Sequence, residues 1–158
     1  MKRSDGLFLR TGRAIAPRYE DIAFETIIAD NACMQLVRDP TRYDVLVAQN
    51  LFGDLLSDLG AGLVGGISNV WAVLRDETDI HVFEAIHGVA PDLVGQGIAN
   101  PLTWIRPAVA MLRHLDEGKA ADRIDAAVAS ALQAGVRTPD IGGTATTAAL
   151  VDAIIARL

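Results

Sequence analysis

Two acidic residues four positions apart are the first candidates for chemistry. Asp54 and Asp58 lie in the segment Asn50-Leu-Phe-Gly-Asp-Leu-Leu-Ser-Asp58. On a helix, residues at this spacing lie on one face, so the two carboxylates would form a polar stripe among leucines. A hard divalent cation such as Mg²⁺ binds a few carboxylate oxygens and keeps positions for water and substrate. The spacing fits a metal site, although a solvated helix face without a ligand is the commoner reason for such a pair.

A glycine-rich stretch is the second candidate. Residues 87–101 contain three glycines, two prolines and few charged side chains. Loops of this length inside a compact domain usually have a function, and small residues let the backbone approach a planar ligand closely. The alternative is a plain connector in which His87 only caps a neighbouring element. The pattern alone does not choose between the two.

The glycines at positions 60–66 fit the spacing G-x-G-x-x-G, which is typical of dinucleotide binding. That fingerprint requires a strand before the glycines and a helix after them. Here a helix is predicted before them. We therefore interpret these glycines as the end of a helix and the start of a loop.

Hydrophobic periodicity predicts the elements that position these residues. Alternating or compact apolar runs predict strands over residues 24–29, 43–48 and 79–84, while residues 67–78 have no regular pattern. Helical spacing predicts helices over residues 6–16, 31–38, 101–115, 120–133 and 146–158, and one from Asn50 to the glycines at 60–66. Pro107 falls inside one of them, where it would delay or bend the helix.

Composition restricts the class of protein. The 158 residues can form one domain with a core, and the net charge of −6 with scattered basic residues argues against a nucleic-acid or anionic-membrane partner. No apolar run could span a bilayer, and no signal peptide opens the chain. A single cysteine, Cys33, excludes an internal disulfide. We expect a cytoplasmic protein that binds a small molecule.

Taken together, the motifs resemble the isocitrate/isopropylmalate dehydrogenase family, the β-decarboxylating dehydrogenases. The resemblance rests on Asp30-Asn-Ala-Cys-Met-Gln-Leu-Val37, Asn50–Leu59, Ala61-Gly-Leu-Val-Gly-Gly66, Phe83-Glu-Ala-Ile-His-Gly88, Gly97-Ile-Ala-Asn-Pro101 and Asp140-Ile-Gly-Gly143. It implies an α/β fold, the C-terminal portion of the family's two-lobe subunit. Residues 1–65 would resemble part of the second, dimer-forming lobe, and residues 66–158 the returning part of the first, cofactor-binding lobe.

The resemblance also implies roles for single residues. Asp54 and Asp58 match metal ligands for Mg²⁺ or Mn²⁺, and Asp30 matches an aspartate that reaches the metal and substrate of a neighbouring subunit, which requires a homodimer. Asp92 would face the ribose hydroxyls and favour NAD over NADP. The cofactor-binding set implied by the resemblance is Glu84, His87, Gly88, Val89, Ala90, Pro91, Asp92, Leu93 and Asn100.

The implied activity is metal- and NAD-dependent oxidative decarboxylation of a 2-hydroxy acid. Isocitrate is favoured, with 3-isopropylmalate, homoisocitrate and tartrate as alternatives. The family's general-base lysine and catalytic tyrosine match no position in this sequence, so we expect no catalytic residue and no turnover from these residues alone. Three features depart from the family pattern: Val89 at a usually polar position, Pro107, and the stretch from Ile67 to Arg75.

Two other interpretations remain open. One is a non-catalytic subunit or binding module of the same fold that pairs with an active partner. Because such subunits tend to lose the metal aspartates, the presence of Asp30, Asp54 and Asp58 argues against it. The other is an ordinary helix-and-sheet domain without a ligand.

Overall fold

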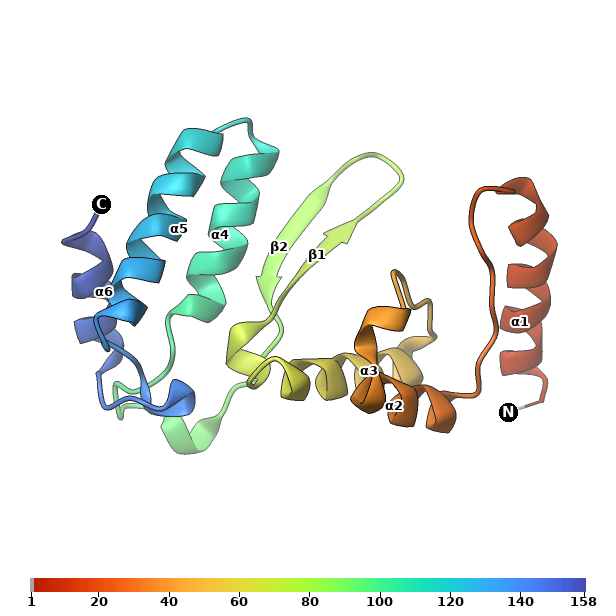
Figure 1. The fold of residues 1–158 in the computed structure, drawn as a ribbon, viewed down its shortest axis with the longest axis horizontal. Helices are drawn as coiled ribbons and strands as arrows, with labels where there is room; N and C mark the ends of the chain where they lie inside the picture. Colours follow the sequence, from red (N-terminus) through yellow and green to blue (C-terminus); the bar gives the residue numbers. More distant parts are fainter. Residues whose placement is uncertain (1) are drawn as a thin grey trace. The chain divides into compact units, whose positions relative to one another are not determined.

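The computed structural model describes residues 2–158, so that Met1 lies outside the described part (Figure 1). The chain forms two compact units, Met1–Gly60 and Ala61–Leu158. Within residues 2–158, no helix combines the length and the apolar character needed to cross a membrane.

Helices dominate the N-terminal unit. It contains α1 (Ser4–Ile15), α2 (Ala29–Arg38) and most of α3 (Asn50–Leu63), which continues into the second unit. Helix α1 ends just before Pro17, and α2 ends where Asp39 accepts a hydrogen bond from the Thr41 N–H at the start of a short 3-10 turn. These three predicted helices are confirmed.

The two strands predicted in this unit are wrong. Residues 23–28 and 44–49 form no regular element, although Ile28 and Tyr43 have extended backbone conformations. A strand exists only when its N–H and C=O groups pair with a neighbouring strand. No described residue pairs with the backbone of residues 23–27 or 44–48.

Helix α3 ends at glycines, as the sequence predicted. Gly65 and Gly66 have φ angles of 102° and 112°, in the left-handed region that favours glycine. A 3-10 turn (Ile67–Asn69) follows instead of a helix, so these glycines are not a dinucleotide fingerprint.

The C-terminal unit contains a β-hairpin. Strands β1 (Trp71–Arg75) and β2 (His81–Ala85) pair antiparallel, from Trp71 opposite Ala85 to Arg75 opposite His81. The prediction of β2 is confirmed, whereas β1 lies in a stretch that we expected to be irregular. It forms because Asp76 accepts backbone hydrogen bonds from Thr78 and Ile80, which fixes the turn that brings β1 beside β2.

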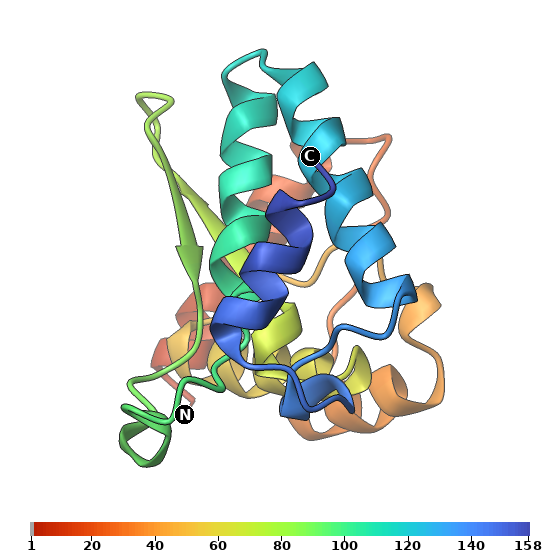
Figure 2. The ribbon, with the colours of Figure 1, turned by 90° about the vertical axis from the view of Figure 1, so that its left-hand side faces the viewer.

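Three helices complete this unit: α4 (Leu102–His114), α5 (Gly118–Gln133) and α6 (Thr147–Ile155), all confirming predicted helices. The hairpin packs against α4, and α5 and α6 pack on the side of α4 away from the hairpin (Figures 1 and 2). The core between them is formed by Leu102, Ala127, Val128, Ala131, Leu150 and Ile154. Pro107 lies within α4 and is fully buried, so the helix continues past a residue that cannot donate its backbone hydrogen bond.

Candidate functional site

The α3 carboxylates are positioned as the sequence predicted. Asp54 and Asp58 lie one turn apart on α3, and both side chains are exposed. Among the described residues, neither carboxylate has a hydrogen bond or an ion pair. Two unpaired like charges one turn apart repel each other, and a divalent cation would remove this repulsion. Their oxygens are hard ligands of the kind that Mg²⁺ and Mn²⁺ prefer.

Asp30 lies in the first turn of α2, where its Oδ1 accepts a hydrogen bond of 2.5 Å from the Asn31 N–H. Within residues 2–158 there is no group of three acidic, histidine or cysteine side chains that could hold a metal ion. The metal roles of Asp54 and Asp58, and that of Asp30 in a neighbouring subunit's site, therefore stay predictions.

The predicted nucleotide loop begins at the end of β2. Glu84 is a half-buried β2 residue opposite Ala72, and His87 starts the exposed part of the loop. A 3-10 turn (Pro91–Leu93) interrupts the loop, and Asp92 lies exposed in this turn. Ala90, just before it, has a φ of 39°, which is rare for a residue with a side chain. Strained backbone of this kind often occurs at ligand-binding loops.

The start of this loop is open to a ligand. The Val89 side chain is 88% exposed, and the backbone N–H groups of Gly88 and Val89 have no partner in the described part of the chain. The His87 ring meets Trp104 edge-on, with ring centroids 6.2 Å apart, and its Nδ1 donates to the Gly88 carbonyl oxygen at 2.8 Å. Trp104 is itself 61% exposed. The loop therefore offers backbone donors beside an exposed aromatic pair, which suits a planar, hydrogen-bonding ligand.

The C-terminal end of the loop is held by hydrogen bonds of the Asn100 side chain. Asn100 is only 6% exposed, and its side-chain oxygen accepts a hydrogen bond from the N–H of Leu102, the first residue of α4. Its side-chain amide donates to Asp140 Oδ2 at 2.8 Å, and the Ser68 hydroxyl donates to the same oxygen at 2.5 Å. Asn100 is thus an internal anchor of the loop, so its side chain is less available to a cofactor than the other predicted residues.

Helix α6 adds two further anchors to this end of the loop. The Thr147 N–H donates to the Gly97 carbonyl oxygen at 2.8 Å, and the Thr147 hydroxyl donates to the Ala99 carbonyl oxygen at 2.5 Å. The loop is therefore fixed at its C-terminal end and open at its N-terminal end.

Asp140 is charged at neutral pH and holds three chain segments together. Partial burial alone would raise the pKa of Asp140, but hydrogen bonds from Ser68, Thr138 and Asn100 outweigh it and lower the pKa below the ordinary value of 3.8. Of these three groups, Ser68 and Asn100 meet the geometric criteria of a hydrogen bond to Asp140, whereas the fully buried Thr138 hydroxyl acts on the carboxylate without meeting them. The sequence showed the motif that contains Asp140 but gave it no role. Only the fold brings Ser68 and Asn100 to its side chain.

Gly143, in the same motif, packs against the backbone of Arg137. A Cβ atom at this position would overlap the Arg137 carbonyl group. The tight approach allows the Gly143 N–H to bond the Thr138 carbonyl oxygen at 3.0 Å and the Ala145 N–H to bond the Arg137 carbonyl oxygen at 2.8 Å. Two backbone hydrogen bonds and this close approach therefore hold the turn that carries Asp140.

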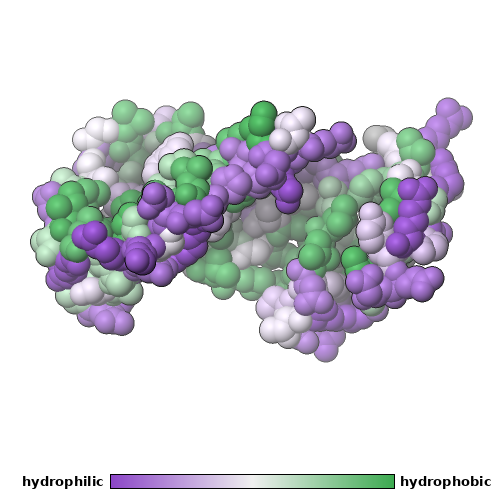
Figure 3. Space-filling view, turned by 90° about the horizontal axis from the view of Figure 1, so that it is seen from above, coloured by the Kyte–Doolittle hydropathy of each residue, from purple (hydrophilic) through white to green (hydrophobic). Residues whose placement is uncertain are grey.

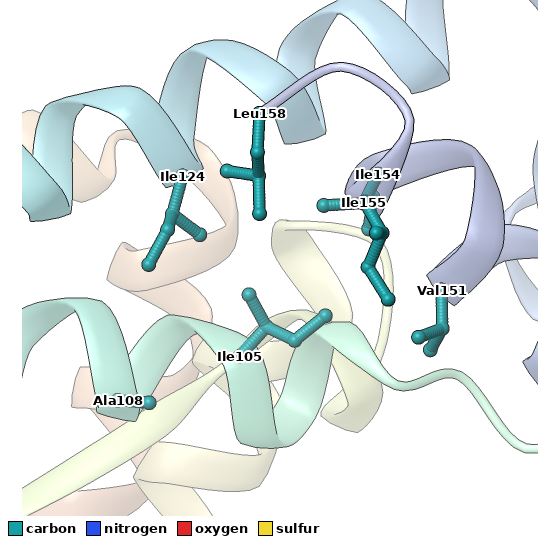
Figure 4. Close-up of a pocket in the computed structure, with 7 residues that line it drawn as sticks. All are labelled: Ile105, Ala108, Ile124, Val151, Ile154, Ile155 and Leu158. Atoms are coloured by element: carbon teal, nitrogen blue, oxygen red, sulfur yellow. The ribbon is translucent and has the colours of Figure 1, made fainter.

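A separate groove of about 270 Å³ lies between α4, α5 and α6. In the close-up of Figure 4, Ile105, Ile124 and Ile155 point toward one another across it. Every residue that lines it is apolar. It offers no hydrogen bond or charge to a metal, a nucleotide or a hydroxy acid, so it is not the candidate site.

Comparison with known proteins identifies relatives along nearly the whole chain. A sequence-family model described as "Isocitrate/isopropylmalate dehydrogenase" matches residues 1–154. The isocitrate/homoisocitrate dehydrogenase of Thermus thermophilus is 47% identical over 155 residues, which are 98% of this chain and 46% of the relative. The mitochondrial NAD isocitrate dehydrogenase catalytic subunit 5 of Arabidopsis thaliana is 43% identical over 98% of this chain and 41% of its own length.

A crystal structure of isocitrate dehydrogenase from Methylococcus capsulatus shows the same fold. It is 46% identical in sequence and matches with a TM-score of 0.88 over 99% of this chain and 47% of that chain. The chain therefore spans less than half the length of the proteins that it matches.

Proposed function

Since this chain belongs to the isocitrate/isopropylmalate dehydrogenase family, we propose that it carries metal- and NAD-binding parts of an enzyme that oxidatively decarboxylates a 2-hydroxy acid. The family assignment and the dehydrogenase names of its relatives support this proposal. The names of three relatives include isocitrate, and one also includes homoisocitrate. We propose isocitrate as the first substrate to test, followed by homoisocitrate, 3-isopropylmalate and tartrate.

The single observation that carries the proposal is the pair of unpaired carboxylates on α3. Asp54 and Asp58 would hold one Mg²⁺ or Mn²⁺ ion, with Asp30 of a neighbouring subunit completing the site in a homodimer. When bound, the ion draws electron density from the substrate oxygens and so stabilises the negative charge left by loss of CO₂. The two aspartates would bind the metal ion without fully neutralising its positive charge.

The loop from Glu84 to Asn100 would hold NAD. Gly88 and Val89 offer free backbone N–H groups, and the exposed Asp92 carboxylate would accept hydrogen bonds from ribose hydroxyls and repel a 2′-phosphate. NAD, when bound, accepts the hydride from the substrate. The chain's own contribution is to orient the nucleotide and to select NAD over NADP.

Fluorescence of Trp104 tests the nucleotide half of the proposal. In a Trp71→Phe variant, Trp104 is the only tryptophan, and it lies beside His87 of the loop. Titration with NAD should change its emission saturably, while NADP should bind about tenfold more weakly, which corresponds to one unfavourable charge contact. In an Asp92→Asn variant this difference should shrink. No saturable change with either nucleotide would contradict the proposed site.

The alternative function is a non-catalytic subunit of the same fold. The presence of Asp30, Asp54 and Asp58 favours the catalytic assignment, because the resemblance implies that non-catalytic subunits tend to lose these metal aspartates. Copurification with a chain that carries a general-base lysine and a tyrosine would favour a split enzyme.

A further inference from the structure

Two histidine rings meet where the hairpin packs against α4. The ring centroids of His81, the first residue of β2, and His114, the last residue of α4, lie 4.1 Å apart with a tilt of 42°. The Phe83 ring lies beside both, with its centroid 6.1 Å from that of His81 and 5.7 Å from that of His114. The side chain of His81 is 14% exposed, whereas His114 is an exposed residue. The rings therefore form an aromatic contact that joins β2 to the end of α4.

Each histidine ring on its own is placed to carry a proton. The His81 Nδ1–H donates to the Asp79 carbonyl oxygen at 3.0 Å, and the Asp79 carboxylate lies 3.8 Å from the same nitrogen. His114 lies in the last turn of α4, where the unpaired carbonyl groups of the helix favour a positive charge. Histidine is the side chain whose charge ordinarily changes between pH 5 and 8. A fall in pH across this range therefore favours a charge on either ring.

Two charged rings in contact would repel each other. Unit charges about 4 Å apart interact strongly even near a protein surface. In the described part of the chain no carboxylate bonds to the His114 ring, and the neighbouring Arg113 already pairs with Asp122 and Asp125 of α5. The segments around the pair carry six further charged residues: Arg75, Asp76, Glu77, Asp116, Glu117 and Lys119. The ring contact therefore stabilises the packing of the hairpin while one ring is neutral, and opposes it when both are charged.

A proton fits this pair better than a metal ion does. Protein-bound zinc takes three or four side-chain ligands, and among the residues that the structure describes no group of three histidine, cysteine or acidic side chains could hold a metal. Hydrophilic residues, in purple, are frequent on the surface of the C-terminal unit, at the left of Figure 3. Because His114 is exposed on this unit, the pair can exchange protons with water.

We propose that His81 and His114 form a proton-sensitive contact, which holds the hairpin on α4 while at most one ring is charged and releases it when both are. A two-stranded hairpin alone is only marginally stable in water, so β1 and β2 would loosen on release. Since β2 leads directly into the loop that begins at His87, the order of that loop would then depend on pH. The contact lies between β2 and α4, so the inference does not depend on the proposed function.

Hydrogen–deuterium exchange of the 158-residue chain tests the release. After correction for the intrinsic pH dependence of exchange, the amides of Trp71–Arg75 and His81–Ala85 should be about tenfold less protected at pH 5.5 than at pH 7.5. The amides of α5 should keep their protection. The pKa values of Asp76 and Asp140 lie below the ordinary 3.8, so both carboxylates stay charged over this range and do not contribute to the change.

Substitution of the two histidines separates repulsion from packing, because His81→Phe and His114→Phe each keep an aromatic ring that cannot be charged. Melting temperatures of the chain, both single variants and the double variant give the coupling between the two positions. This coupling should favour the native pair at pH 7.5 and oppose it at pH 5.5, a change of about 3 °C. The folded chain binds the second proton less tightly than the unfolded chain, so the stability that the pair supplies is present at pH 7.5 and is lost as the pH falls.

The matched control is His87→Phe, at the third histidine of the sequence. It should keep the loss of hairpin protection at pH 5.5, whereas His114→Phe should abolish it. Three results would overturn the proposal. The first is equal protection of the hairpin amides at both pH values, a measurement that needs no variant. The second is a coupling that does not change with pH. The third is a loss of protection that persists in His114→Phe or disappears in His87→Phe, since either would assign the pH response to a different group.

Discussion

The side-chain amide of Asn100 donates a hydrogen bond of 2.8 Å to Asp140 Oδ2, across forty positions of sequence. This bond joins the last residue of the proposed nucleotide loop to the turn that precedes α6. Because Asn100 also accepts a hydrogen bond from the N–H of Leu102, the first residue of α4, the pair joins the loop to the start of α4 and to this turn. The conformation of the loop therefore depends on Asp140, which lies outside the loop.

Replacing Asp140 should loosen this connection. Asp140→Asn removes the charge that accepts hydrogen bonds from Ser68 and Asn100. We expect a loss of about 1 kcal/mol in the free energy of unfolding, since the carboxylate is only partly buried. NAD should also bind more weakly, because the loop is less ordered. Chemical denaturation and NAD titration measure the two effects.

The matched control is Asp152→Asn, which removes an exposed carboxylate from α6. It should leave both quantities unchanged. If Asp140→Asn and Asp152→Asn had equal effects, the carboxylate would have no anchoring role.

Stability should fall in acid, partly because of Asp140. The pKa of Asp140 is lower in the folded chain than its ordinary value of 3.8, so the folded state binds this proton less tightly than the unfolded state. Its contribution is complete above about pH 4 and is lost as the pH falls through the lowered pKa. Denaturation curves at stepwise pH between neutral and strongly acid should show this loss.

In Asp140→Asn the acid-induced loss should be smaller but not absent. Asp76 has a lowered pKa too, because the Thr78 hydroxyl and the Ile80 N–H donate to it. An unchanged pH dependence in Asp140→Asn would contradict the role assigned to its hydrogen bonds.

Two glycine substitutions should have opposite effects. Gly143→Ala forces a Cβ atom into the Arg137 backbone, and we expect a loss of about 2–3 kcal/mol in the free energy of unfolding. Gly118→Ala, at the start of α5, meets open space and should stabilise the chain by up to about 1 kcal/mol. Thermal unfolding of both variants checks this. Equal tolerance at both positions would show that the Gly143 turn can relax.

The purified 158-residue chain should form no NADH from isocitrate in the presence of Mn²⁺ and NAD. The family resemblance assigns proton transfer to a lysine and a tyrosine that match no position of this sequence. Absorbance of NADH measures the reaction. Turnover that exceeds the rate without protein would mean that residues of this chain transfer the protons.

The sequence predicted the helices because each has its own local signals. Pro17, the Asp39-Pro40 pair and Gly65 end helices in the structure close to where they were expected to. The strands are different, because a strand also depends on its neighbour. Residues 43–48 have a strong strand pattern but no partner, whereas β1 has a weak pattern and forms because β2 is joined to it by a tight turn.

In the candidate site, too, the sequence predicted what depends on local spacing and missed what depends on contacts between distant residues. The spacing of Asp54 and Asp58 fixes their position on one face of α3, because a helix converts spacing into geometry directly. Asn100 was predicted as a cofactor residue, and that role stays a prediction, while the anchoring of its buried side chain to Asp140 had no signal in the sequence. Asp140 was missed because its partners Asn100 and Ser68 lie 40 and 72 positions away and only the tertiary fold assembles them.

Binding of Mn²⁺, followed by electron paramagnetic resonance, tests the central claim most directly. We expect the 158-residue chain to take up free Mn²⁺ saturably, with Asp54→Asn and Asp58→Asn each weakening the binding at least about tenfold and Asp152→Asn leaving it unchanged. Binding that is absent, or that all three variants reduce equally, would contradict the assignment of the α3 carboxylates as a metal site.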